Sequence, residues 1–344
     1  MTGSLGASPL EGVDVVLADL DGVVYAGHRA IPHAVDALTE AAASGRRVGY
    51  LTNNASRTPQ TVAAQLRELG LATEPDDIVS SPQAAVVLLA GLVPARATVL
   101  VVGGDGLVSE LERAGFRVTR SADDAPAAVV QGFAPEVAWT DLAEAAFALK
   151  GGDAGIPWVA TNTDWTIPQA RGTAPGNGTL VSAVHTAVGR LPVVAGKPER
   201  ALFDVAVERF GAQHPLFIGD RLDTDILGAR RAGMPSALVL TGIDGPKQLL
   251  AAAADSRPDF VLEDLRGLST PYPRVEDVRD IAGVRRVRVG AAMVRHQGSA
   301  LTLETPGSDI DRIRAAAAAV WGAGVPIYAL EVAPELYSWR ERGE

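Results

Sequence analysis

Acidic side chains that follow apolar runs are the residues of this 344-residue sequence best suited to chemistry. Asp19 and Asp21 come directly after the apolar run of "VVLADLDG", separated by one leucine, and Gly22 permits the backbone to turn. Asp220 ends a second apolar run in "FIGDRLDTD", and Asp225 lies a few residues further on. Carboxylates that lie close together disfavour simultaneous ionisation unless a cation sits between them. Because hard divalent ions such as Mg²⁺ prefer oxygen ligands, these acids predict a magnesium site.

Each acidic segment also has a purely structural interpretation when it is taken alone. "DLDG" is typical of a strand followed by an Asp-Gly turn, and Asp223 is suited to capping the helix that follows it. Asp220 at the end of a strand is harder to explain in this way when Asp19 ends another. The repeated pattern therefore favours a site.

Donor groups that suit an anion lie in two further segments. Lys197 lies in "VVAGKPE" between a glycine and a proline, and Thr52, Asn53 and Asn54 lie in "YLTNNAS". A lysine, hydroxyl and amide donors before a helix, and a metal ion together describe a phosphate-binding site. A phosphate group is therefore the expected ligand.

The elements that must position these residues are short β-branched runs, which alternate with helical patterns rich in alanine and leucine. This alternation predicts α/β folding around a Rossmann-like parallel core sheet, in which the carboxyl ends of the strands line the ligand crevice. The expected buried strands are residues 13–20, 47–53, 192–196, 215–220, 236–242 and 259–265. The first four end in the acids and donors, which gathers these residues at one edge.

The chain is longer than one hydrophobic core usually supports, which predicts several domains. A second α/β series, with strands expected in "TVLVVGG", "FRVTRS", "AAVVQGF" and "PWVATN", separates the two groups of candidate residues. We therefore expect a core of residues 1–92 and 192–268 with an inserted α/β cap domain of residues 93–191. "STPYPRVED" is interpreted as a linker, and residues 274–344 as a small α+β module in the order ββαβα. Its expected elements are a hairpin of residues 284–298 and 299–307, a helix at residues 308–324, a strand at residues 325–332 and a short terminal helix.

Composition narrows the classes of partner. A formal net charge of −10 argues against nucleic-acid binding, which depends on clustered Lys and Arg. No apolar run is long enough to span a membrane, and the start of the sequence lacks an export signal. The absence of cysteine fits a reducing compartment, so we expect a cytoplasmic protein without nucleic-acid or membrane partners. The five histidines lack ligand spacing, which argues against zinc.

Four segments in order, "DLDGV", "TNN", "GKP" and "GDRLDTD", resemble the four motifs of the haloacid dehalogenase superfamily. The chain is similar to the nitrophenylphosphatase-like branch, which includes glycerol-phosphate, phosphoglycolate and pyridoxal-phosphate phosphatases with an α/β cap. The resemblance extends over residues 13 to about 268. It implies an Mg²⁺-dependent phosphatase that acts on a small phosphorylated metabolite, and a homodimer is a further expectation.

The resemblance implies a role for each acid. Asp19 would attack phosphorus to form an aspartyl-phosphate, and Asp21 would protonate the leaving alkoxide and then activate water. Mg²⁺ would bind the Asp19 carboxylate, the Asp21 backbone carbonyl and the Asp220 carboxylate. Asp225 would orient metal-bound water or the lysine. Dehalogenases of the superfamily lack the second acid of the first motif, so Asp21 favours phosphatase chemistry.

The donors would bind the phosphate itself. By the same resemblance Thr52, Asn53 and Asn54, with Lys197, would bind the non-bridging phosphate oxygens and stabilise charge during transfer.

The cap segment "ATNTDWTIPQARGTAPGNG" is similar to the branch's substrate-selecting loop. Asn162 and Asp164 follow an expected strand end, although an Asx-turn with a glycine-rich return explains the same residues. Ile167 stands where pyridoxal-phosphate members carry a histidine, which makes a flat aromatic substrate less favoured. We expect glycerol 3-phosphate first, 2-phosphoglycolate second, and other sugar or nucleotide phosphates after these.

Other functional interpretations stay open. A catalytically weak regulator that binds a phosphorylated metabolite would also keep the fold. The C-terminal module is similar to part of an N-acetyltransferase fold, although docking, oligomerisation or regulation is favoured over a second activity. Within it Arg285, Arg286 and Arg288 could bind an anion or protect an exposed strand edge. "VVGGDG" could indicate nucleotide binding or a glycine-rich turn of the cap.

Overall fold

A computed structural model describes residues 6–152, 155–169, 171–281 and 283–339. The described residues form two compact units, one from Met1–Arg47 with His214–Glu344 and the other from Val48–Gln213. The predicted core of residues 1–92 and 192–268 and the predicted cap of residues 93–191 have other boundaries than these units and remain a proposal.

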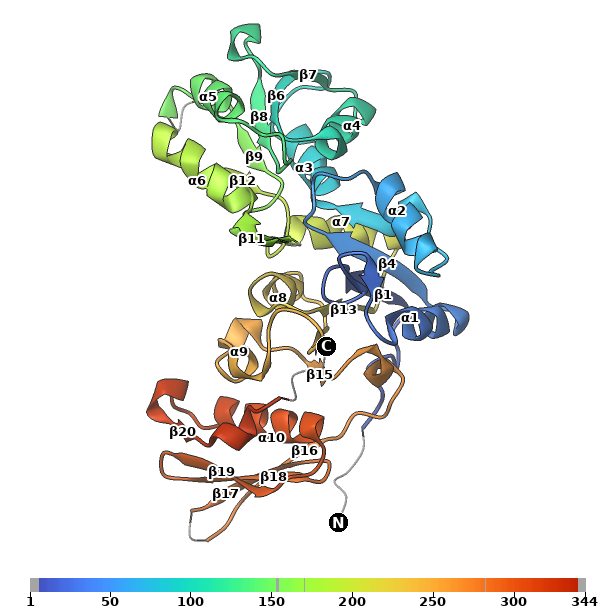
Figure 1. The fold of residues 1–344 in the computed structure, drawn as a ribbon, viewed down its shortest axis with the longest axis vertical. Coiled ribbons are helices and arrows are strands. Elements are labelled where there is room, and N and C mark those ends of the chain that lie inside the picture. Colours follow the sequence, from blue (N-terminus) through green and yellow to red (C-terminus); the bar gives the residue numbers. More distant parts are fainter. Residues whose placement is uncertain (1–5, 153–154, 170, 282, 340–344) are drawn as a thin grey trace. The chain divides into compact units, whose positions relative to one another are not determined.

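The first unit contains four parallel strands that were predicted from the sequence (Figure 1). Their order across the sheet is β15, β14, β13, β1. The strands are β1 (Val15–Asp19), β13 (Pro215–Gly219), β14 (Ser236–Val239) and β15 (Phe260–Leu262). A small antiparallel pair follows β1, β2 (Tyr25–Ala26) and β3 (Arg29–Ala30), and the helices are α1 (Ala34–Ala43), α8 (Leu227–Arg231) and α9 (Pro246–Leu250).

The C-terminal module belongs to the same unit and has more strands than its sequence predicts. Its sheet has the order β16, β17, β18, β19, β20, antiparallel except for the last pair. The elements are β16 (Val275–Arg279), β17 (Arg285–Val289), β18 (Ala292–Gln297), β19 (Ala300–Thr305), α10 (Asp309–Trp321) and β20 (Glu331–Val332).

Four expectations about this module need correction. Part of the expected linker forms β16, and residues 284–298, expected as one strand of a hairpin, fold back at Gly290 as β17 and β18. The strand expected at residues 325–332 is only two residues long, and the terminal helix is a single 3₁₀ turn, Pro334–Leu336.

Helix α10 joins this sheet to the parallel strands of the first unit. Its apolar side, including Ile313, packs with Val294 of β18 and with Leu238 and Leu249 in one continuous hydrophobic cluster. Burial of this apolar surface is the main stabilising contribution available to so small a module. The module is therefore docked within its unit.

The second unit contains a parallel pair and a separate five-stranded parallel sheet (Figure 1). The pair is β4 (Arg47–Thr52) with β5 (Ile78–Ser80), accompanied by α2 (Pro59–Glu68), α3 (Ser81–Ala90) and α7 (Arg200–Phe210). The larger sheet has the order β12, β9, β8, β6, β7, namely β12 (Val193–Val194), β9 (Trp158–Ala160), β8 (Ala128–Gln131), β6 (Thr98–Val102) and β7 (Arg117–Thr119). Its helices are α4 (Asp105–Arg113), α5 (Trp139–Ala148) and α6 (Asn177–Val188), and a hairpin is formed by β10 (Thr166–Gln169) and β11 (Gly172–Pro175).

The strand expected at residues 192–196 differs from its prediction. Only Val193 and Val194 are extended, they pair with β9 of the five-stranded sheet, and Val193 is exposed. The strand β5 was not expected, because "IVS" is too short to show a period. No helix in the described part of the chain is long and apolar enough to cross a membrane.

Candidate active site

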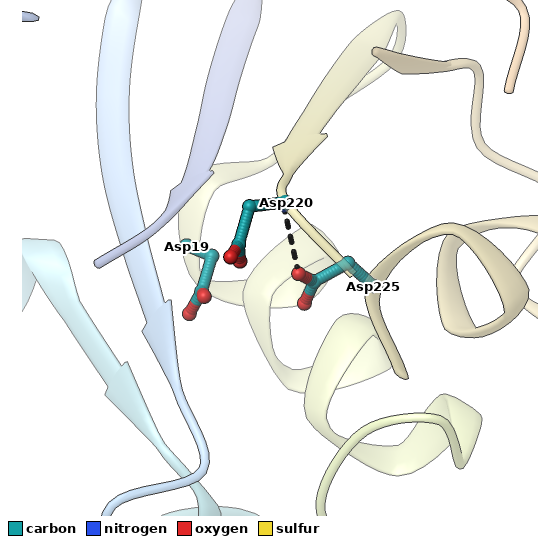
Figure 2. A group of neighbouring side chains, drawn as sticks. All are labelled: Asp19, Asp220 and Asp225. Atoms are coloured by element: carbon teal, nitrogen blue, oxygen red, sulfur yellow. Dashed lines mark hydrogen bonds between the residues drawn. The ribbon is translucent and has the colours of Figure 1, made fainter. Parts of the chain in front are cut away.

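Three carboxylates converge at the ends of two neighbouring strands of the first unit (Figure 2). Among the residues that the structure describes, Asp19, Asp220 and Asp225 form the group of acidic side chains close enough to hold a metal ion. One carboxylate oxygen from each lies within 4.8 Å of the others. Asp220 and Asp225 are buried and Asp19 is half-buried.

The parallel pairing of β1 with β13 explains why two distant segments meet. Ala18 pairs with Ile218, so Asp19 at the end of β1 lies next to the residues that lead into Asp220. Both strands run in the same direction and end at the same edge of the sheet, where ligands bind in open α/β sheets. The predicted meeting of the two acidic motifs is therefore observed.

Asp225 holds the loop that carries Asp220. It lies in a π-helical turn, Leu222–Ile226, and its Oδ2 accepts the backbone N–H groups of Asp220 and Arg221, each at 3.1 Å. A carboxylate that accepts two backbone donors fixes their direction as well as satisfying them. The role predicted for Asp225 was to orient metal-bound water or Lys197; within this unit its observed partners are backbone groups.

A second acid supports the same loop. Asp244 accepts the N–H of Leu222 at 2.6 Å, and burial raises the pKa of the Asp244 carboxyl. By contrast, Asp223 is exposed and pairs with Arg221 at 2.8 Å, so it forms an ion pair instead of the helix cap that its structural interpretation predicted.

Two glycines form a close cradle around Asp220. A Cβ atom on Gly22 or on Gly242 would overlap the Asp220 carboxylate, and Gly22 has a positive φ of 80°. The neighbouring backbone N–H of Ile243 donates to Asp220 Oδ2 at 2.7 Å. One oxygen of Asp220 is thus held by the protein, and no side chain can replace either glycine without displacing it.

This donor set fits Mg²⁺. It consists of carboxylate oxygens, which are the ligands that hard divalent cations take, and three acids packed together call for a cation between them. The Asp21 side chain is exposed and lies outside the carboxylate group. The backbone turns there, because the Gly22 N–H donates to the Tyr25 carbonyl at 2.9 Å.

The donors of the second unit lie at the end of β4 and on loops. Thr52 is the last residue of β4, and its hydroxyl oxygen accepts the N–H of Asn54 at 3.1 Å. Asn54 Oδ1 in turn accepts the Ser56 N–H at 2.9 Å. Helix α2 begins only at Pro59, so these donors do not lie at a helix N-terminus as predicted. The reason is that two local side-chain turns intervene before the helix can start.

Asn53 is oriented by the protein rather than turned towards solvent. Its carboxamide is hydrogen-bonded to both the N–H and the carbonyl of Lys197, and Lys197 is a buried residue with 3% of its surface exposed. A Cβ on Gly196 would come within 2.5 Å of Asn53 Oδ1, so only glycine permits this approach. Asn53 and Lys197 are therefore neighbours, as a shared phosphate site requires.

The loop after β9 forms the Asx-turn of its structural interpretation, and its role in substrate selection stays a prediction. The Asp164 N–H donates to Asn162 Oδ1 at 3.1 Å, which is an Asx-turn. The "PGNG" return is tightly packed, because a Cβ on Gly176 or Gly178 would overlap the backbone of residues 163–164. Ile167 lies in β10 and is half-buried.

The remaining candidates have structural explanations. In the module, Arg285 pairs with Asp277 at 2.6 Å and Arg286 pairs with Asp280 at 2.9 Å. The hydrogen bond from Arg285 lowers the pKa of the Asp277 carboxyl. These cross-strand pairs explain two of the arginines without a bound anion. The "VVGGDG" glycines form the turn from β6 to α4.

Two contributors to the site escape prediction from sequence. Gly242 follows β14 at the same sheet edge and Asn177 opens α6, where its Nδ2 donates to the Asn162 carbonyl at 2.7 Å. Gly242 could have been found from its position, because "LVLTG" ends a third parallel strand at the sheet edge where the acids lie.

Comparison with protein families agrees with this geometry. The chain matches a family described as haloacid dehalogenase-like hydrolase over residues 16–117 and one described as HAD-hydrolase-like over residues 194–268. These ranges contain both acidic strand ends and Lys197. The chain belongs to the haloacid dehalogenase-like hydrolases.

Individual relatives are phosphatases. The chain is 42% identical to the D-glycerol 3-phosphate phosphatase of Mycobacterium tuberculosis over 90% of this chain and 86% of the relative. It is 35% identical to the glycerol-3-phosphate phosphatase of Gallus gallus over 80% of this chain and 96% of the relative.

Solved structures extend the similarity to the C-terminal module. The crystal structure of the M. tuberculosis glycerol phosphate phosphatase in complex with magnesium is 39% identical, with a TM-score of 0.84 over 96% of this chain and 97% of that one. The 4-nitrophenylphosphatase of Thermotoga maritima, 29% identical with a TM-score of 0.70, covers 76% of this chain and 98% of its own. The resemblance inferred from the four motifs extends only to about residue 268. The M. tuberculosis structure covers 96% of this chain, so the structural similarity includes the C-terminal module.

Proposed function

We propose that this chain hydrolyses glycerol 3-phosphate to glycerol and phosphate in an Mg²⁺-dependent reaction. The observation that carries the proposal is the carboxylate group of Asp19, Asp220 and Asp225, in a chain 42% identical to a D-glycerol 3-phosphate phosphatase. Hydrolase chemistry follows from the family, and the phosphatase reaction and the choice of ester follow from the relatives.

The reaction begins with attack by an Asp19 carboxylate oxygen on phosphorus. As this bond forms, the bond from phosphorus to the glycerol oxygen breaks, and Asp21 donates a proton to the leaving alkoxide. Asp21 then removes a proton from water, whose oxygen attacks phosphorus and releases the Asp19 carboxylate and inorganic phosphate. The exposure of Asp21 suits a group that exchanges protons with water.

The other charged groups manage the negative charge of the substrate. Asp19 and Asp220 would hold Mg²⁺, with Asp225 fixing the Asp220 loop, and the ion would supply positive charge beside an anionic nucleophile and an anionic phosphate. Lys197 and Thr52 bind non-bridging oxygens, and Asn53 and Asn54 shape the loop that presents them.

The test is phosphate release from a panel of esters: glycerol 3-phosphate, 2-phosphoglycolate, pyridoxal phosphate, sugar phosphates and nucleoside monophosphates. We expect release that needs Mg²⁺, stops with EDTA and is fastest with glycerol 3-phosphate. Asp19→Asn should lower it by at least about 10⁴-fold, because the nucleophile is lost. Release from no ester, with binding of glycerol 3-phosphate intact, would instead favour a metabolite-binding regulator.

Three further expectations, on location, domain boundaries and oligomeric state, accompany this function. We propose a cytoplasmic location, a core of residues 1–92 and 192–268 with a cap of residues 93–191, and a homodimer. Light scattering at several protein concentrations tests the homodimer, and a monomeric mass throughout would refute it.

A further inference from the structure

The Asn53 side chain is hydrogen-bonded to both the backbone N–H and the backbone carbonyl of Lys197. Its Oδ1 accepts the Lys197 N–H at 2.8 Å, and its Nδ2 donates to the Lys197 carbonyl at 3.1 Å. The carboxamide thereby satisfies the two backbone groups that a neighbouring strand would bond if Lys197 lay in a sheet. The backbone from which the buried lysine side chain projects is therefore set by one asparagine.

The same amide nitrogen also contacts an acid on the five-stranded sheet's loop. Asn53 Nδ2 lies 3.2 Å from each carboxylate oxygen of Asp164. One amide hydrogen thus bonds the Lys197 carbonyl and the other bonds the Asp164 carboxylate. Because both acceptors face Nδ2, rotation of the amide by half a turn would bring oxygen against oxygen, and the charged acceptor strengthens the preference.

Asp164 is itself held firmly in place. Its N–H donates to Asn162 Oδ1 at 3.1 Å, and its carbonyl accepts the N–H of Gly178 at the start of α6 at 2.9 Å. Asn162 Nδ2 donates to the Asn53 carbonyl at 2.7 Å, so the loop after β9 contacts Asn53 at its backbone as well as its side chain. The position of Asp164 is consequently a property of β9 and α6.

We propose that Asp164 is a positioning residue for Lys197, acting through the Asn53 amide. This inference rests on the proposed function only in assigning phosphate binding to Lys197. Asp164 then affects every phosphate ester alike, because it orients the group that binds the shared phosphate. A residue that selected the substrate would instead change the ranking of esters.

The decisive measurement is amide hydrogen exchange at Lys197, which does not depend on activity. Asp164→Ala and Asn53→Ala should each speed this exchange by about tenfold or more, because each loosens the same pair of hydrogen bonds. The double variant should exchange no faster than Asn53→Ala, since the two residues act in series. Asp164→Asn keeps an acceptor oxygen and should restore most of the protection.

A matched control is Asp141→Ala. Asp141 also lies in the second unit and accepts one backbone N–H, that of Ala138 at 2.8 Å. It makes no hydrogen bond to Asn53 among those described, so exchange at Lys197 should match the wild type. Unchanged exchange in Asp164→Ala, or effects of Asp164→Ala and Asn53→Ala that add in the double variant, would overturn the proposal.

Kinetics on the ester panel supply the second readout. Asp164→Ala should lower kcat/KM for all hydrolysed esters by a similar factor, about tenfold, without reordering them. A reordered panel with normal exchange at Lys197 would place Asp164 against the substrate and refute the positioning role. Should the wild type hydrolyse no ester, the proposed function fails, while hydrogen exchange still decides whether Asp164 positions Lys197.

Discussion

The outer edge of β15 provides a sharp test of how the segment before the C-terminal module and the module itself stabilise the protein. Val261 is the middle residue of this strand, and its backbone bonds are made by side chains. The N–H donates to the Tyr272 hydroxyl at 2.9 Å, and the carbonyl accepts from Arg314 Nε on α10 at 2.8 Å. The Arg314 guanidinium also lies 4.3 Å from the centre of the Tyr272 ring. An edge strand is thus closed by two stacked side chains instead of another strand.

Tyr272→Phe is the variant that isolates one of these bonds. The ring keeps its edge-to-face contact with Phe260, whose centroid lies 5.1 Å away, so no cavity opens. What is lost is the acceptor for a buried N–H, and leaving such a donor unpaired costs about 1–3 kcal/mol of unfolding free energy. Urea unfolding should show this loss as a lower midpoint at an unchanged slope. Amide exchange at Val261 should rise by about tenfold or more.

The matched control is Tyr328→Phe. Tyr328 is 88% exposed, so removal of its hydroxyl should change the unfolding free energy by less than about 0.5 kcal/mol. If Tyr272→Phe behaves like this control in both assays, the hydroxyl does not close the edge of β15, and the reasoning is wrong.

Two further predictions concern other buried contacts. Gly242→Ala should raise the Mg²⁺ concentration needed for half-maximal phosphate release by about tenfold to a hundredfold, because the added methyl displaces the Asp220 carboxylate. If the variant needs no more Mg²⁺ than the wild type, Gly242 does not control the position of Asp220. Asp277→Asn should lower stability at neutral pH by leaving Arg285 buried without its anion. Because the folded pKa of Asp277 is lowered, wild-type stability from this pair is present above the carboxyl's ordinary pKa and is lost as the pH falls through the folded value. As the pH is lowered, the denaturant midpoint of Asp277→Asn should fall less than that of the wild type. If the two midpoints fall in parallel, the Asp277–Arg285 pair does not supply this stability.

Local sequence was sufficient for the parts of the site that depend on strand direction. The apolar runs before Asp19 and Asp220 specify buried strands, and parallel strands in an α/β sheet end at one edge. The acids, the carboxyl edge and the magnesium site could therefore be predicted. The phosphatase class followed from the order of the four motifs, and the family comparisons agree.

Predictions were weaker where a short segment depended on distant partners. Residues 284–298 were expected as one strand, but Gly290 allows the chain to turn back and bury alternate residues of two strands under α10. The segment at 192–196 was expected to be buried, yet only two residues pair, and with β9. A run of a few apolar residues does not encode which neighbour it will bond, because pairing is decided by the whole sheet.

What the sequence by itself determined is the chemistry: which acids and donors the chain carries, and that buried strands end in them. Only the tertiary structure decided what each polar atom contacts. Asn53 is a predicted phosphate ligand, and the structure shows its amide bonded to Lys197 and Asp164. Asp225 holds the backbone of Asp220, and Gly242 makes room for its carboxylate. The physical reason is that hydrogen bonds act over about 3 Å, so a polar side chain's role depends on atoms that folding brings there from far along the chain.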